Sequence, residues 1–176
     1  DPASGDYSEV TRTSYDSFGN LLELISPSGA REVYVYYAAA GENGCPPSPS
    51  GRPHYLKSKR VIPAPDYVHA SATNVEHTYL DLPSLRDNSQ RFIVLRSDGL
   101  YENSAAQPTV RTTYSYITDT AHPFYGKPSA KTEHMGGNST AYAYAYAVNE
   151  KVVGFSQTVE VGNQFYAQLI ECDVFT

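Results

Sequence analysis

Histidine and cysteine are the residues of this sequence best suited to metal binding. Neither Cys45 nor Cys172 stands in a Cys-x-x-Cys pair or beside a histidine at ligand spacing. No two histidines are separated by the three residues of a helical metal site. The sequence therefore predicts no metal site and no cofactor. The five histidines are scattered along the chain: His54, His69, His77, His122 and His134.

Motifs for nucleophilic or phosphoryl chemistry are also missing. The chain holds no Gly-x-Ser-x-Gly, His-Glu-x-x-His, phosphate-loop or calcium-loop pattern. A Ser/His/Asp triad assembled from distant loops stays open as an alternative, because triads are recognised by geometry and not by chain order. We read His134, which precedes Met135-Gly136-Gly137, as a strand-end residue and not as a general base. We expect no enzymatic activity.

The two cysteines leave the redox state open. Cys45 lies in a Pro/Gly-rich stretch and Cys172 ends a strand-like run. Two cysteines do not make a disulfide framework, so two unpaired thiols are favoured over a single bridge.

One binding surface is suggested by an alternating stretch near the C-terminus. Residues 141–146 read Ala-Tyr-Ala-Tyr-Ala-Tyr, so Tyr142, Tyr144 and Tyr146 share one face of a strand. We favour cross-strand packing of these rings. The alternative is an exposed platform that stacks on a carbohydrate or a peptide.

The charge of the 176-residue chain argues against nucleic acid as a partner. It holds 13 basic and 19 acidic residues, a formal net charge of −6, whereas phosphate and anionic membrane surfaces attract an excess of Lys and Arg. No window approaches the roughly 20 apolar residues of a membrane span. The first residues do not resemble a signal peptide. Because the chain does not begin with Met, we expect a segment of a longer protein, although a removed leader would look the same.

The elements that carry these residues are predicted to be strands. Sixteen Tyr, no Trp and many Thr and Ser favour β-structure, and turn residues recur about every ten positions. We predict one all-β unit, an antiparallel hairpin meander that forms a curved sheet, with closure into a sandwich-like layer as an alternative. Apart from a single helical turn at 83–86, no helix is predicted. Ser97-Asp98-Gly99 is predicted to be a turn. The predicted strands are 20–25, 31–37, 55–62, 74–80, 91–96, 100–102, 109–117, 129–134, 141–146, 152–161 and 164–172.

The stretch YDSFGNL, residues 15–21, is predicted to be a hairpin corner. Asp16 can accept hydrogen bonds from the backbone ahead of it, and Gly19 can take a positive φ. Ser26-Pro27-Ser28-Gly29 repeats this logic, and Gly162-Asn163 fits a further corner. Residues 38–53 are too rich in Pro and Gly for a helix or a central strand, which predicts a long loop. We therefore divide the chain into hairpins at 1–37, this loop, and further hairpins at 54–176.

Residues 15–21 and 36–65 carry a resemblance to a known family. Tyr15, Asp16, Gly19, Asn20 and Leu21 match the YD repeat of Rhs proteins, Tyr-Asp-x-x-Gly-Asn/Arg-Leu. The segment YYAAAGENGCPPSPSGRPHYLKSKRVIPAP, residues 36–65, is similar to a stretch in the B component of bacterial insecticidal Tc toxin complexes. Loosely recurring Tyr-containing strands at 11–16, 76–81, 111–116 and 139–144 are read as degenerate repeat units.

The resemblance implies a structural role. In that family, YD/Rhs hairpins build a hollow shell of spiralling β-sheet that holds a toxic polypeptide until delivery. It implies a secreted virulence protein whose partners are other YD/Rhs segments and toxin-complex subunits. The Asp-rich, Trp-containing self-cleavage signature of the family's C component has no counterpart here, so no catalytic residue is carried over. Unpaired sheet edges would also allow association into oligomers.

Overall fold

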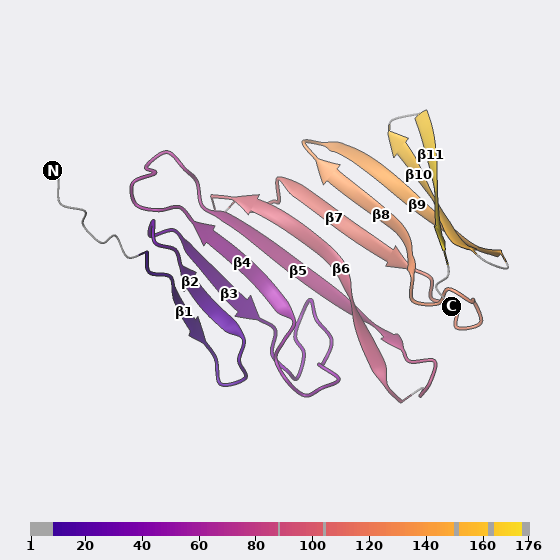
Figure 1. Ribbon diagram of the computed structural model, residues 1–176, viewed down its shortest axis with the longest axis horizontal. Helices are drawn as coiled ribbons and strands as arrows, with labels where there is room; N and C mark the ends of the chain where they lie inside the picture. The colour runs from indigo at the N-terminus through magenta and orange to yellow at the C-terminus, as the bar shows by residue number, and fades with distance from the viewer. Residues whose placement is uncertain (1–8, 88, 104, 150–151, 162–163, 174–176) are drawn as a thin grey trace.

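The computed structural model describes residues 9–87, 89–103, 105–149, 152–161 and 164–173, with side chains through residue 146. These residues form eleven β-strands and no helix, which confirms the predicted all-β antiparallel meander (Figure 1). The strands are β1 (Arg12–Tyr15), β2 (Leu21–Ile25), β3 (Arg31–Tyr36), β4 (Leu56–Ile62), β5 (Thr73–Pro83), β6 (Arg91–Glu102), β7 (Val110–Tyr116), β8 (Pro128–Met135), β9 (Asn138–Asn149), β10 (Val152–Val161) and β11 (Gln164–Asp173).

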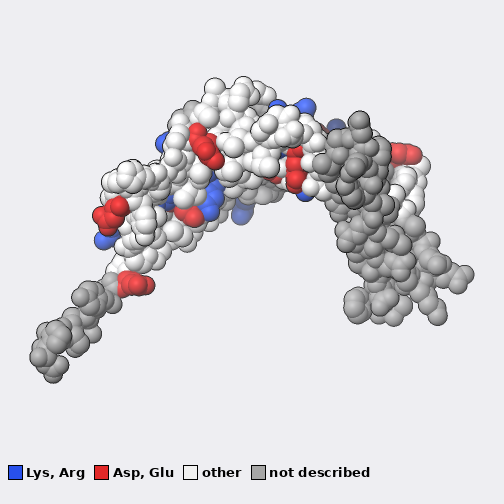
Figure 2. Space-filling view, turned by 90° about the horizontal axis from the view of Figure 1, so that it is seen from above, with Lys and Arg blue, Asp and Glu red and all other residues white. Residues whose placement is uncertain are grey.

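All eleven strands belong to one sheet, and their spatial order is their order in the chain. Each strand pairs antiparallel with the next, so the chain forms hairpin after hairpin across the sheet (Figure 1). The sheet is a single arched layer and does not fold over into a sandwich, so that alternative is wrong (Figure 2). Every connection is local, and strands that each turn back beside their predecessor extend a sheet without supplying a second one.

The single layer leaves little interior. The chain exposes 12277 Å², whereas a compact monomer of this mass exposes about 8,500 Å² by the usual scaling of surface with mass. Within the described residues, no large side chain is less than 2 % exposed. The buried hydrophobic residues there are Tyr37, Cys45, Ala64 and Leu82. The fold is held by strand pairing and by aromatic side chains lying across it, with only local patches of core.

Hairpin corners lie where turn chemistry places them. Gly19 has φ +87° and Gly29 has φ +84°, the left-handed conformation that glycine adopts without a Cβ penalty. The Gly29 N–H donates to the Ser26 carbonyl over 2.9 Å, which closes the second predicted corner. A further tight turn at Gly136-Gly137 joins β8 to β9, where Met135 pairs with Asn138. The Gly162-Asn163 corner lies outside the described residues.

Two local predictions are wrong. Residues 97–99 do not turn but continue β6, because they pair with β5 on one side and with β7 on the other. This double pairing outweighs the local turn preference of Ser-Asp-Gly. Residues 83–86 form no helical turn, since Pro83 is the last residue of β5 and Ser84 donates its backbone N–H to Gln90 across the β5–β6 connection.

The long loop between β3 and β4 is confirmed, and it lies at the point where β4 and β5 separate. The two strands pair only through the register Ser58–Glu76 to Val61–Thr73. Beyond that point the loop lies beside β5 in place of β4, and the backbone N–H of Tyr79 donates to the carbonyl of Gly44 over 2.7 Å. In Figure 1 the loop fills the space between the start of β4 and the later part of β5. The loop therefore replaces a missing length of strand.

The sheet ends in two edge strands, β1 and β11. β1 has only four residues, all exposed, and its pairing with β2 shifts register between Ser14 and Tyr15. Short length and a register irregularity are features that discourage edge-to-edge aggregation. β11 is longer, with ten residues paired to β10 on its inner side.

Candidate functional site

The YD corner is a closed hydrogen-bonded unit. Oδ1 of Asp16 accepts from the backbone N–H of Phe18 at 2.8 Å and from that of Asn20 at 2.9 Å. The Asn20 side chain donates to Oδ2 of Asp16 at 2.8 Å, while Tyr15 pairs with Leu21 across the strands. Partial burial raises the pKa of Asp16, but the bonds from Asn20, Phe18 and Gly19 outweigh this and lower it below its usual value. The motif residues thus act as a corner built around a carboxylate.

The same corner is tied to the long loop. The side-chain amide of Asn20 also donates to the carbonyl of Pro53, 33 residues later. Asn20 therefore links the first hairpin to the end of the loop that precedes β4. This contact could not be predicted from the sequence, because no local pattern relates position 20 to position 53.

The predicted tyrosine row (Tyr142, Tyr144 and Tyr146) lies in β9 with its three side chains half-buried, whereas Ala143 and Ala145 are exposed. The hydroxyl of Tyr142 donates to Oε2 of Glu133 at 3.0 Å, and that of Tyr146 donates to the carbonyl of Pro128 at 2.7 Å. The Tyr146 ring stacks on Phe124 with centroids 5.1 Å apart. These contacts lie within the chain and match the packing interpretation of the row.

Tyr142 also belongs to a cluster that recurs in the sheet. Its ring lies under the ammonium of Lys131, 4.5 Å from Nζ, and Lys131 forms an ion pair with Glu133 at 2.6 Å. The bond to Glu133 and burial raise the pKa of Tyr142, and the bond from Lys131 lowers that of Glu133. Lysine, glutamate and tyrosine thus satisfy one another across the β8–β9 hairpin.

The β3–β4 hairpin repeats this arrangement. The Tyr34 hydroxyl donates to Glu32, Lys59 pairs with Glu32 at 3.0 Å, and Nζ of Lys59 lies 5.5 Å from the Tyr34 ring centroid. In both hairpins the lysine is directly opposite the tyrosine, Lys59 opposite Tyr34 and Lys131 opposite Tyr142. Two hairpins far apart in the sequence therefore share the same set of contacts among a lysine, a glutamate and a tyrosine.

A second aromatic cluster anchors the long loop. The Tyr79 ring lies edge-on to Tyr37 at 5.9 Å and is tilted against Tyr55 at 5.3 Å. Tyr37 donates to the His77 carbonyl at 2.7 Å, and Tyr79 donates to the Leu56 carbonyl at 3.0 Å. Burial raises the pKa of Tyr79 to about 12. Beside the rings, Cys45 is a buried free thiol, and burial raises its pKa, so it lacks the features of a reactive thiolate.

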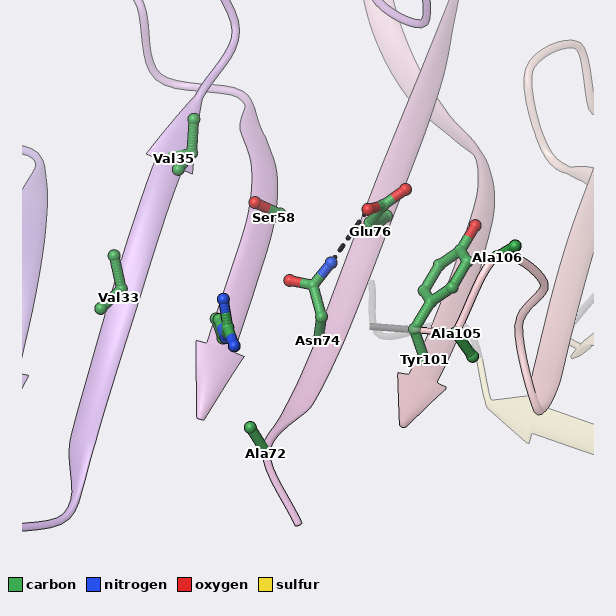
Figure 3. Close-up of a pocket in the computed structure, with 10 residues that line it drawn as sticks. Val33, Val35, Ser58, Ala72, Asn74, Glu76, Tyr101, Ala105 and Ala106 are labelled. Carbon is green, nitrogen blue, oxygen red and sulfur yellow. Dashed lines mark hydrogen bonds between the residues drawn. The ribbon is translucent and has the colours of Figure 1, made fainter. Parts of the chain in front are cut away.

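A hollow of about 630 Å³ opens over β3–β6 (Figure 3). Val33 and Val35 form one wall, and Tyr101 with the segment that follows β6 forms the other. Glu76 accepts a hydrogen bond from the Asn74 side chain at 2.9 Å on its floor. The remaining lining residues are Ser58, Arg60, Ala72, Ala105 and Ala106. The ten lining residues come from four strands and two connecting segments, so spacing in the sequence could not group them.

The histidines do not assemble a hydrolytic site in the described part of the chain. His134 comes closest, since its Nδ1 lies 2.7 Å from Oγ of Ser139 across the β8–β9 turn. Both residues are exposed, and no carboxylate among the described residues hydrogen-bonds to His134 to orient its ring. His77 is different: its Nδ1 is buried without a hydrogen-bond partner, and burial lowers its pKa, while Asp98 acts in the opposite direction.

Metal-binding geometry is likewise not found where side chains are described. No group of three or more His, Cys, Asp or Glu residues there is arranged to hold a metal ion. In the described part of the chain, no helix has the length and apolar character needed to cross a membrane.

Comparison with known proteins adds no relative. No protein-family model matches the chain, and neither a curated protein nor a solved structure is detectably similar to it.

Proposed function

We propose that this chain is a non-catalytic wall segment of an Rhs/YD-repeat β-shell in an insecticidal toxin complex, where it helps to enclose or deliver a toxic polypeptide. The observation that carries the proposal is the sheet itself. Eleven strands follow one another in a single open layer with two free edges and almost no interior. A layer of this kind is suited to be part of a larger surface, because it lacks the second layer that normally buries a core.

Repetition within the sheet supports the same reading. The YD corner closes around Asp16, and the lysine–glutamate–tyrosine cluster recurs in the β3–β4 and β8–β9 hairpins. Hairpins of related design, added one after another, would extend a wall at both edges. The partners expected from this proposal are further YD/Rhs hairpins that pair with β1 and β11.

The experiment uses the full product of the reading frame that contains this chain. Negative-stain electron microscopy should show a hollow particle, and residues 9–173 should be protected from protease within it. A protein without further YD hairpins, or a compact particle with no lumen, would overturn the proposal. Small-angle scattering of the 176-residue chain alone provides a second check, since an isolated sheet should be extended or associated through its edges.

A tyrosine-rich binding face is the competing function. It is less well supported, because Tyr142 and Tyr146 already contact Glu133, Pro128 and Phe124 within the chain. A glycan array tests it directly. Glycan binding that Tyr142→Ala abolishes without loss of folding would favour the binding module over the shell.

A further inference from the structure

A second hollow, of about 420 Å³, lies between the long loop and strands β5–β7. Three hydroxyl side chains cross its floor in one row, because Thr78 pairs with Ser97 and Ser97 pairs with Thr113 in the sheet register. Residues directly opposite on neighbouring strands share a face. The first two hydroxyls lie 2.7 Å apart, and Ser97 is buried. The row is therefore a fixed set of polar groups.

Two arginines, Arg96 and Arg111, also line this hollow, together with Asn43 from the loop. Neither arginine has an ion-pair partner among the described residues, whereas Arg31, Lys57, Lys59, Arg91 and Lys131 each do. No carboxylate lines the hollow. The residues that line this hollow are thus two arginines and six neutral residues.

The nearest acidic residues are engaged elsewhere. Asp98 follows Ser97 in the strand, so its side chain points to the opposite face, where it accepts a bond from Tyr114 at 2.9 Å. Glu42 belongs to the loop and is paired with Lys57 at 2.6 Å. Glu76 lies on the same face as Arg111, across Gly99 in the sheet register, but it accepts from Asn74 and forms no ion pair with either arginine. Arg111 also acts on Tyr101, whose pKa it lowers although burial raises that pKa overall. Within the described residues, no ion pair therefore neutralises Arg96 or Arg111.

We propose that this hollow binds an anion of the phosphate class, either as the free ion or as a phosphate monoester. Guanidinium groups bind such oxyanions through paired, charge-assisted hydrogen bonds, and the hydroxyl row supplies further donors. Two positive charges are better matched by a dianion such as phosphate than by a single carboxylate, which carries one negative charge. The hollow is larger than one phosphate ion, so it also accommodates the body of an ester. This site does not depend on the shell proposed above.

Isothermal titration calorimetry of the full chain tests the site, with inorganic phosphate and phenyl phosphate as probes and sodium chloride at equal ionic strength as the blank. Arg96→Gln and Arg111→Gln should each weaken binding about tenfold, the loss expected for one charge-assisted contact. Arg60→Gln is the matched control, since it removes an arginine from the neighbouring hollow and should leave binding unchanged. Urea unfolding of each variant confirms that it is folded.

The two probes distinguish the sources of the phosphate group. Tighter binding of phenyl phosphate identifies a monoester as the natural ligand, whereas equal or tighter binding of inorganic phosphate identifies the free ion. Absence of saturable binding by both probes overturns the proposal. An equal loss of affinity in Arg60→Gln also overturns it, because attraction would then come from the general charge of the face.

Discussion

The backbone N–H of Tyr79 donates to the carbonyl of Gly44 over 2.7 Å, and this bond joins the long loop to the middle of β5. β4 stops pairing with β5 at Ser58–Glu76, so the later part of β5 would otherwise present unpaired backbone groups on that side. The segment satisfies two of those groups, the Tyr79 N–H through Gly44 and the His77 carbonyl through the Tyr37 hydroxyl, and Tyr37 and Cys45 are among the most buried residues described. A segment predicted only as a loop is thus part of the sheet's support.

Gly44→Ala should destabilise the protein more than Gly51→Ala. Both glycines lie in the loop with positive φ, +100° and +68°, so both substitutions carry a backbone cost. A Cβ at Gly44 would also lie 2.5 Å from the Tyr37 hydroxyl, whereas a Cβ at Gly51 meets nothing within 4 Å. We expect Gly44→Ala to cost about 1–3 kcal/mol more, as overpacking does. Urea unfolding measures the difference, and equal losses would show that the Tyr37 contact can relax.

Gly19→Val should destabilise the first hairpin through the backbone alone. Gly19 has φ +87° and open space around its Cβ position, so no neighbour has to move. We expect a loss of about 1–2 kcal/mol, the cost of a left-handed conformation for a residue with a side chain. Gly19→Asn should lose less, because Asn tolerates this conformation. Unchanged thermal stability of the valine variant would contradict the corner geometry.

The contribution of Asp16 should disappear in acid. Its pKa is lowered in the folded state, so its stabilising effect is present above its usual pKa and is lost as the pH falls through the lower, folded-state value. Asp16→Ala should therefore lower the melting temperature at neutral pH, and the difference from the unsubstituted protein should shrink as the pH falls below the usual aspartate pKa of about 3.9. Ser17→Ala in the same corner is the control. A difference that persists unchanged at acid pH would assign the effect of Asp16 to something other than its charge.

Two tyrosines should titrate late in alkali. Burial raises the pKa of Tyr79 to about 12, and burial with the bond to Asp98 raises that of Tyr114 to about 12. A raised folded-state pKa stabilises the protein below the usual tyrosine value of about 10, and this stability is lost as the pH rises toward 12. Tyr79→Phe and Tyr114→Phe should each remove part of the last phase of tyrosinate absorbance. A last phase of unchanged amplitude in both variants would refute the assignment.

The stacked pair Phe124 and Tyr146 should be energetically coupled. Their ring centroids are 5.1 Å apart at an interplanar angle of 28°. A double-mutant cycle with Phe124→Ala and Tyr146→Ala should give a coupling of about 0.5–1.5 kcal/mol, as for other aromatic pairs. Additive losses would indicate that the ring of Tyr146 gains nothing from Phe124, which would return weight to the idea of a stacking platform.

Local chemistry predicted most of the hairpins correctly. The corner at Asp16–Gly19 and the strand periods of β3, β4, β7 and β9 depend on neighbours a few residues apart, which a sequence displays directly. The prediction of a turn at 97–99 was wrong because this segment is decided by distant strand partners and not by neighbouring residues. Its residues favour a turn in isolation, but pairing on both sides of β6 keeps them extended. Strand partners 12 to 23 residues away in the sequence keep that segment extended.

The sequence by itself determined that the chain is a meander of antiparallel strands, because strand propensity and turn residues alternate along it and most connections are short. The tertiary structure decided three further points: the sheet stays open, the long loop is bonded to β5 through Gly44 and Tyr79, and Arg96 and Arg111 line one hollow beside a row of hydroxyls. These features depend on register and curvature summed over several strands. Register and curvature bring together residues that are far apart in the chain, and no local pattern of residue types encodes their proximity.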